Sequence, residues 1–140
     1  MPIKIRWLIS YFYADKFVVG VVAFIRKNDK ILLLKHSYHY HWSLPGGFLK
    51  KKEDAYTAIK REIKEETGLD IKVNDILKIH YGSKKPILDI IVDCQLVGGK
   101  IKVDEKEIKS AKFFPINELP LNDILNIHRE YIKEYKSNPS

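Results

Sequence analysis

The segment from Asp54 to Thr67 constrains the fold most, because its apolar residues and its acids fall on the same side of one helix. The apolar residues recur at helical spacing and predict a stripe that faces a core; they are Ala55, Ala58, Ile59 and Ile63. At about 100° per residue, Glu62 and Glu66 fall near the middle of this stripe, and Glu65 falls to one side of it. Gly68 suits the left-handed position that ends a helix. The sequence therefore predicts a helix that packs on a core while holding carboxylates against it.

Carboxylates in such a place need a positive partner. An isolated buried carboxylate costs several kcal/mol, and neighbouring carboxylates repel one another as well. Arg61 precedes Glu65 by four residues and can neutralise one acid, which leaves surplus negative charge on hard oxygen ligands. Such ligands bind Mg²⁺ or Mn²⁺. An ordinary charged helix face is the alternative, because segments such as REIKEE are common in helices.

The residues around this helix follow a longer pattern, which favours the metal site. From Gly47 the chain reads GFLKKKEDAYTAIKREIKEETGL, with Glu53 five residues after that glycine and Arg61-Glu62 seven residues later. The aliphatic Ile63, one further residue, the pair Glu65-Glu66, another residue and Gly68-Leu69 complete the segment. The pattern resembles the signature of the Nudix hydrolases, and every fixed position of that signature is filled. The preceding WSLPGG, residues 42–47, also resembles the usual lead-in of this family.

The resemblance implies a fold, an activity and a set of site residues. The fold is the α/β (α+β) Nudix αβα sandwich with a mixed central sheet, from about Phe17 to Leu119, with the Nudix box at 47–69. The length of the chain separately predicts a single domain over residues 1–140. Glu62, Glu65, Glu66 and the carbonyl of Gly46 would bind Mg²⁺ (or Mn²⁺), while Arg61 would hold the glutamates in place. Glu53 would support the metal cluster, directly or through water. The reaction would be attack of water on a phosphoanhydride in a nucleoside diphosphate linked to another group.

Two further parts of the chain bear on this resemblance. The stretch VDEKEIKSAKFFPINELP, residues 103–120, resembles the late family segment that supplies an extra acid. Glu107 is the first candidate for that acid and Glu105 the second, and family members differ over which glutamate is the general base. Many members carry an acid and a glycine shortly before the box glutamate, where this chain has Lys50 and Lys52.

Several side chains beside the box are candidates for binding the rest of the substrate. HSYHYHW, residues 36–42, offers Tyr38, His41 and Trp42 as rings for a base or sugar, although Tyr38 and Trp42 equally suit closing the core. Lys50 to Lys52 are candidates for contacts with phosphate oxygens, although three consecutive lysines in a loop are more often only solvated. Pro86 falls near a position where members that hydrolyse ADP-ribose often have a proline.

The predicted function is hydrolysis of a small nucleotide, such as ADP-ribose or a (d)NTP, with a divalent metal. Two alternatives stay open: an RNA 5′-end pyrophosphohydrolase, suggested by the net charge of +7, and a Nudix domain that senses a nucleotide without cleaving it. A surface of solvated lysines is the favoured explanation of that charge, so nucleic acid is a less favoured partner. A homodimer is left open.

Other segments predict the remaining architecture. FVVGVVAFIR and ILLLKH predict a hairpin, residues 71–82 and 86–97 predict two strands, and Gly98-Gly99 predicts a turn into KIKV. The tail, about 121–136, predicts an amphipathic helix with His128 on its apolar stripe as a core histidine. Strands beside two such helices predict a mixed sheet covered on both faces.

Composition narrows the compartment. The longest apolar run, Phe17 to Ile25, is shorter than the roughly 20 residues of a membrane span, and no secretory cleavage site follows the N-terminal stretch. Cys94 is the only cysteine, so we expect a small buried thiol, no disulfide and the reducing cytoplasm.

Overall fold

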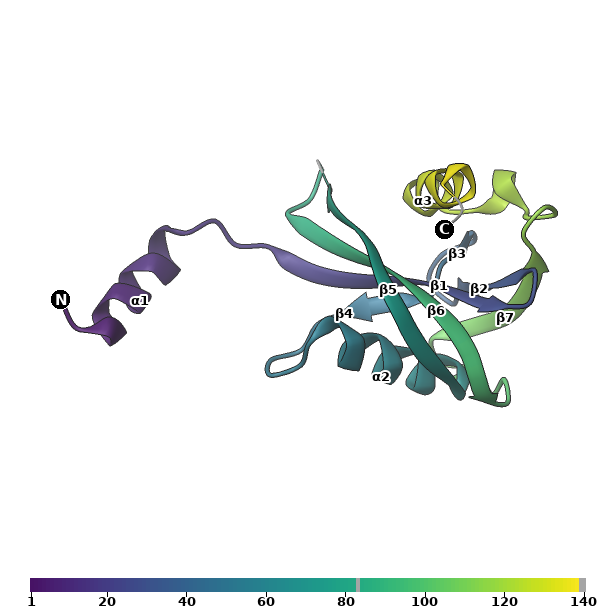
Figure 1. Ribbon diagram of the computed structural model, residues 1–140, viewed down its shortest axis with the longest axis horizontal. Coiled ribbons are helices and arrows are strands. Elements are labelled where there is room, and N and C mark those ends of the chain that lie inside the picture. Colours follow the sequence, from purple (N-terminus) through teal and green to yellow (C-terminus); the bar gives the residue numbers. More distant parts are fainter. Residues whose placement is uncertain (83, 139–140) are drawn as a thin grey trace.

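The computed structural model describes residues 1–82 and 84–138, and a seven-stranded mixed sheet with a helix on each face forms its body (Figure 1). The helices that cover the sheet are α2 (Ala55–Thr67) and α3 (Asn126–Ser137); the others are α1 (Ile3–Tyr13) and the short 3₁₀ helix η1 (Leu121–Asp123). The strands are β1 (Val18–Lys27), β2 (Lys30–His36), β3 (Trp42–Ser43), β4 (Gly46–Phe48), β5 (Leu69–Gly82), β6 (Ile87–Gly99) and β7 (Ile108–Pro115). Among these residues, no helix has the length and apolar character needed to cross a lipid bilayer.

The sheet is built around β1. This strand pairs in parallel with β6 and antiparallel with β2 and β4, while β5 forms the edge beyond β6 and β7 pairs with β2. The hairpin predicted from FVVGVVAFIR and ILLLKH is therefore confirmed. The predicted mixed sheet, covered by a helix on each face, is confirmed as well.

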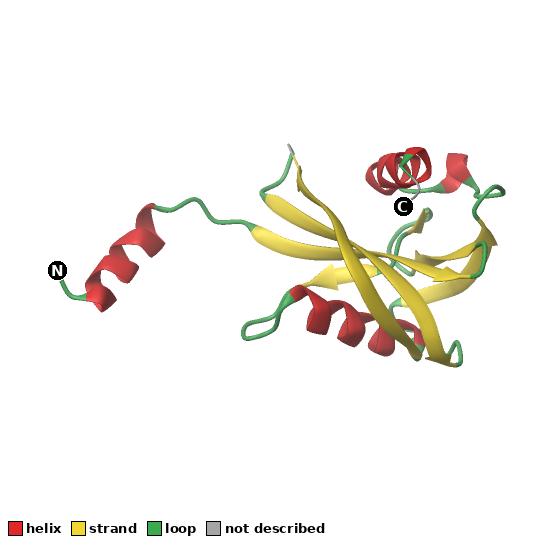
Figure 2. Cartoon of the chain, viewed as in Figure 1, coloured by secondary structure: helices red, strands yellow, loops and turns green. Residues whose placement is uncertain are grey.

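Each face of the sheet carries its own core, as Figure 2 shows by the helices on either side. Val21, Ala23 and Ile25 of β1 pack in the cluster under α2, whereas Val22 and Phe24 pack in the cluster under α3. Successive side chains of a strand point to opposite faces, so a strand covered on both faces is apolar throughout. This arrangement explains the uninterrupted apolar run of β1.

The ends of α2 follow its sequence. Asp54 precedes the helix and its carboxylate accepts a hydrogen bond from the Thr57 backbone N–H at 2.7 Å. Gly68 ends the helix in the left-handed conformation, with φ 73°. The prediction of a helix that Gly68 terminates is confirmed.

Two predicted boundaries need correction. β6 continues through Gly98 to Gly99, which lies opposite Leu69 on β5, and residues 100–103 form no strand. The predicted hairpin turn at Gly98-Gly99 is therefore wrong. The chain turns at Gly68, directly after α2, so β5 starts alongside this glycine pair and the two glycines continue β6 instead of ending it.

The C-terminal helix is also shorter than predicted. Residues 121–123 form η1, and α3 starts only at Asn126. The segment between them is extended because the Leu125 N–H donates to the Trp42 carbonyl at 2.9 Å and Ile124 is buried in the core under α3. The helical spacing of apolar residues in 121–125 therefore reflects the burial of an irregular segment. The sequence did not predict four elements: α1, β3, β4 and β7.

Candidate active site

Arg61 is the centre of the acidic cluster on α2. Its guanidinium donates to both carboxylate oxygens of Glu53, at 2.7 and 3.0 Å, and to Glu62 at 2.8 Å. Longer hydrogen bonds reach Glu65 at 3.3 Å and the Phe48 carbonyl at 3.2 Å. One cation therefore joins three box glutamates to the strand β4.

The pair of Arg61 and Glu53 fixes the loop before α2. Glu53 also accepts a hydrogen bond from the Lys50 backbone N–H at 2.6 Å. The hydrogen bonds from Arg61 are the main reason why the pKa of Glu53 is lowered to about 2, and the same pairing raises the pKa of Arg61. Both groups stay charged at neutral pH, so this connection between loop and helix persists.

Glu66 is not hydrogen-bonded to Arg61 and is buried, at 6% exposure. One of its carboxylate oxygens, Oε1, lies 3.5 Å from Nε2 of His36, and the other, Oε2, is buried without a hydrogen-bond partner among the described residues. Burial raises the pKa of Glu66; the charges of Glu62 and Glu107 add to this, and His36 opposes it. A buried, partnerless carboxylate oxygen is a position where a cation is expected to bind.

A backbone cradle faces the same carboxylates. Gly46 and Gly47 lie on β4, opposite Val22 and Val21 of β1. A Cβ at Gly47 would collide with the carboxylate of Glu62, and a Cβ at Gly46 would collide with the Val21 carbonyl. Only glycine permits this close approach of β4 to both α2 and β1.

The donor set fits a divalent cation. Among residues 1–82 and 84–138, no three acidic, histidine or cysteine side chains stand together as a finished metal site. The reason is visible in the contacts, because Arg61 draws Glu62 and Glu65 to itself while Glu66 turns toward His36. The hard oxygens, the partnerless Oε2 of Glu66 and the cradle at Gly47 nonetheless match the preference of Mg²⁺ and Mn²⁺.

Glu107 lies next to the His36 end of β2. It occupies the turn before β7, where Ile108 pairs with His36, and its carbonyl accepts a hydrogen bond from the Ser37 N–H at 2.8 Å. The charge of Glu107 adds to the raised pKa of Glu66. This placement supports Glu107 as the extra acid.

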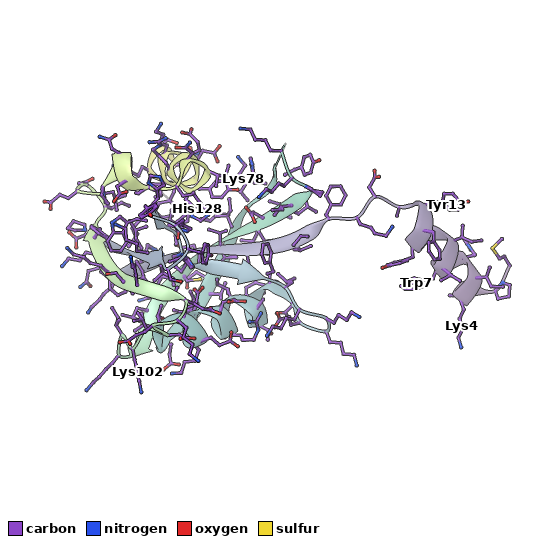
Figure 3. All side chains as sticks on the ribbon, turned by 180° about the vertical axis from the view of Figure 1, so that it is seen from behind. Lys4, Trp7, Tyr13, Lys78, Lys102 and His128 are labelled. Atoms are coloured by element: carbon purple, nitrogen blue, oxygen red, sulfur yellow. The ribbon has the colours of Figure 1, made fainter. Side chains whose placement is uncertain are left out.

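A hollow runs from the glycine cradle to α3. A cavity of about 480 Å³ is lined by Gly46, Gly47, His36 and His128, and a second of about 620 Å³ by Lys84, His80 and Arg129. Both are lined by Lys85, Ile87, Asp89 and Ile127, so they form one trough between the start of β6 and α3. His128, labelled in Figure 3, points from α3 into the interior, where its Nδ1 accepts the Leu44 N–H at 2.9 Å.

The predicted substrate residues lie at different distances from this trough. Tyr38 is exposed and lines the cavity beside the cradle. Trp42 packs edge-on against Phe114, with ring centroids 4.9 Å apart, and His41 pairs with Asp123 at 3.2 Å. Neither Trp42 nor His41 lines the trough. The contact with Phe114 favours the structural role of Trp42. The side chain of Lys50 is exposed on the loop before α2.

Four residues that line the trough were not predicted from the sequence: His36, Ser43, Lys85 and Asp89. The Ser43 hydroxyl lies 3.3 Å from Nδ1 of His36, and the Tyr131 hydroxyl donates to Asp89 at 3.0 Å. Each of these contacts joins residues from different elements. The one available signal was that His36 and Asp89 are polar residues within strands of apolar character.

The chain is similar to known proteins in sequence and in fold. The family model for the NUDIX domain matches residues 16–135. An ADP-ribose pyrophosphatase of Methanocaldococcus jannaschii is 35% identical over 124 residues, which are 84% of this chain and 72% of that protein. A solved ADP-ribose pyrophosphatase of Streptococcus suis superposes with a TM-score of 0.72 at 25% identity, covering 89% of this chain and 96% of that one. A NUDIX hydrolase of Nitrosomonas europaea gives 0.82 at 20% identity, covering 91% and 74%, and shows the fold alone.

Proposed function

This chain belongs to the Nudix family and is a pyrophosphohydrolase, and we propose that it hydrolyses ADP-ribose or a closely related nucleoside diphosphate with Mg²⁺ or Mn²⁺ bound. The observation that carries the metal dependence is the buried, partnerless Oε2 of Glu66 beside the Arg61 cluster. The named activity of the M. jannaschii relative supports the choice of substrate.

The metal would be held by Glu62, Glu65, Glu66 and the Gly46 carbonyl. When bound, it would offset charge on the phosphate oxygens and lower the pKa of the attacking water. Arg61 orients Glu62 and Glu65, Glu53 fixes Arg61, and Glu107 serves as the late acid. The close approach at Gly47 keeps β4 against Glu62, so the diphosphate is bound at the cradle end of the trough.

The trough provides room for the remainder of a small nucleotide. Cavities of about 480 and 620 Å³ lie within the size range of small-molecule sites. Lys85 and Arg129 supply positive charge for phosphate, Asp89 supplies an acceptor for sugar hydroxyls, and Tyr38 supplies a ring at the exposed rim. The single, buried Cys94 supports a reducing compartment such as the cytoplasm.

A substrate panel tests this proposal. ADP-ribose, the (d)NTPs and a 5′-triphosphate RNA are each incubated with the protein in Mg²⁺, in Mn²⁺ and in EDTA. We expect ADP-ribose and water to give AMP and ribose 5-phosphate fastest, with no turnover in EDTA. Absence of turnover on every substrate would contradict the proposal.

Two other outcomes would select the alternatives. Tight binding of ADP-ribose without cleavage and without metal dependence indicates a nucleotide sensor. Preferred cleavage of the RNA, with activity that declines steeply with salt, indicates a 5′-end hydrolase, because binding to a nucleic-acid backbone is strongly salt-dependent.

A further inference from the structure

The N-terminal helix α1 packs against no other element among residues 1–82 and 84–138. None of its 11 residues is buried, and an extended segment joins it to β1, so that it stands well away from the sheet (Figure 1). Figure 3 shows Trp7 and Tyr13 on this helix with no other part of the protein beside them. Trp7 and Phe12 are 65% and 68% exposed, which is unusual for large apolar side chains.

The sequence of α1 is apolar on nearly every side. At about 100° per residue, the polar side chains Arg6 and Ser10 share one narrow arc and Lys4 stands alone among apolar neighbours. A helix that is apolar on nearly every side is normally buried against other protein surfaces. It is too short to cross a bilayer, at about 17 Å against about 30 Å, and it lacks the broad polar face of a helix that lies on a membrane surface.

The total surface area indicates how much cover is missing. The chain exposes 9534 Å², whereas a compact monomer of 16.4 kDa exposes about 7,500 Å². The excess of about 2,000 Å² is at least the area that each partner buries in a stable dimer, which is about 800 Å² in standard interfaces and more in obligate ones. One protein partner of ordinary size accounts for this excess.

The same chain carries a second uncovered apolar surface, here named the β5 patch and defined by Phe17, Ile76, Ile79 and Tyr81. These side chains are 43 to 62% exposed. Ile76 and Ile79 lie opposite Val92 and Ile90, which pack toward α2, so the patch continues the α2 face of the sheet beyond the helix. Phe17 contacts Tyr81 edge-on at 5.6 Å, which ties the start of β1 to the patch.

We propose that two copies of this chain form a symmetric dimer by exchanging α1, each helix packing on the β5 patch of the other copy. An exchange covers both apolar surfaces with one contact type, as a twofold interface requires. Only residues 14–16 separate α1 from Phe17, and Ala14 is extended. The helix α1 is therefore directed away from the β5 patch of its own chain. β5 is an edge strand, the place where an added element gives protection against uncontrolled pairing.

Light scattering after gel filtration, at about 50 µM protein and 150 mM salt, gives the first test. We expect a mass of about twice 16.4 kDa for the unaltered chain and a single-copy mass for Trp7→Glu/Phe12→Glu and for Ile79→Glu. The matched controls are Ser10→Glu, on the polar arc of α1, and Val97→Glu, an exposed aliphatic position at the far end of β6. Both controls are expected to stay dimeric, and circular dichroism confirms that each variant is folded.

A crosslink distinguishes exchange from other ways of covering α1. Leu8→Cys and Ile79→Cys chains are refolded together and oxidised; Cys94 does not interfere, since burial raises its pKa to about 12. Exchange predicts a disulfide between the two differently substituted chains on a non-reducing gel. A monomer at 50 µM overturns the proposal, whether α1 folds back on its own patch or binds vesicles of anionic lipid. A dimer that survives Trp7→Glu/Phe12→Glu overturns it as well.

Discussion

Among single residues, Arg61 and Glu66 show two ways of placing charge on a packed helix. Arg61 hydrogen-bonds to three glutamates, but its single positive charge leaves this cluster with surplus negative charge. Glu66 is buried beside His36, and one of its oxygens keeps no partner among the described residues. Structural stability alone does not account for that oxygen, which makes Glu66 the most informative position to change.

Replacing Glu66 by Gln keeps the size of the side chain and removes its charge. We expect turnover to fall by orders of magnitude, while the Tm of the metal-free protein stays the same or rises, because burial disfavours the charged form. Glu65→Gln is expected to lower turnover likewise, and Glu118→Gln, an exposed position after β7, serves as the control. An active but unstable Glu66→Gln protein would exclude Glu66 from the metal site.

His36 is expected to orient Glu66. Its Nε2 faces Oε1 of Glu66 and its Nδ1 faces the Ser43 hydroxyl, so the ring leaves Oε2 free for a ligand. His36→Gln should weaken Mn²⁺ binding by about 10- to 100-fold, the usual effect of removing a group that positions a metal ligand. Calorimetric titration with Mn²⁺ measures this directly, and His41→Gln, an exposed histidine between β2 and β3, is the matched control. Unchanged Mn²⁺ affinity would show that His36 only fills space.

Among helices and strands, the short connections decide where the site residues lie. Pro45 and the glycines after it bring β4 against β1, and the loop of residues 49–54 returns the chain to α2. Lys52 in this loop has φ 64°, a conformation that glycine adopts freely and lysine rarely does. Lysine at this position, where many family members have glycine, therefore holds a strained backbone conformation.

Lys52→Gly should relieve that strain. We expect a gain in unfolding free energy of up to about 1 kcal/mol, because the left-handed conformation costs a non-glycine residue about 1–2 kcal/mol and glycine returns part of it as chain entropy. Urea unfolding measures the change. Lys51→Gly is the control, since Lys51 has no positive φ and should show a small loss instead. Equal effects in the two variants would refute the strain.

The docking of α3 should depend on pH through His128. Burial lowers the pKa of His128 to about 4, and the charges of His36 and His39 add to this. The neutral ring accepts the Leu44 N–H at Nδ1. The unfolded chain protonates near 6.5, so stability is complete above that pH and falls between about 6.5 and 4, by up to about 3 kcal/mol. His128→Asn keeps an acceptor and removes the titration, so unfolding curves at pH 7 and pH 5 should differ less for the variant. The same pH dependence in both proteins would contradict this assignment.

In the molecule as a whole, the sheet with α2 and α3 forms one compact body, and α1 extends from it. The body supplies every residue of the proposed site, and α1 supplies none. Assembly and catalysis are therefore separable by substitution, which allows each proposal to fail without the other.

Exchange of α1 predicts that thermal stability depends on protein concentration. Tm should rise as the concentration of the unaltered chain is raised from about 1 to 100 µM, because association stabilises the folded state by mass action. The Trp7→Glu/Phe12→Glu chain should show a constant, lower Tm. Scanning calorimetry over this range is the measurement, and a Tm independent of concentration in the unaltered chain contradicts a dimer held together by α1.

The sequence alone determined the parts of this protein that depend on local spacing. The caps and acids of α2, the apolar strands β1 and β2, and the family signature all lie within stretches of fewer than 25 residues, where helix and strand periodicity act directly. The sheet covered on both faces followed from the same periodicity. The role of His128 as a satisfied core histidine also followed, because its position on an apolar stripe is local.

Tertiary structure decided what joins distant segments. His36 meets Glu66 across 30 positions and Tyr131 meets Asp89 across 42, and no periodicity encodes such pairs. β7 was not predicted because its partner β2 lies more than 70 residues earlier, and the start of α3 was set by the contact of Leu125 with Trp42. Local patterns report which face of an element is buried. They do not report what it is buried against, because that depends on packing of the whole chain.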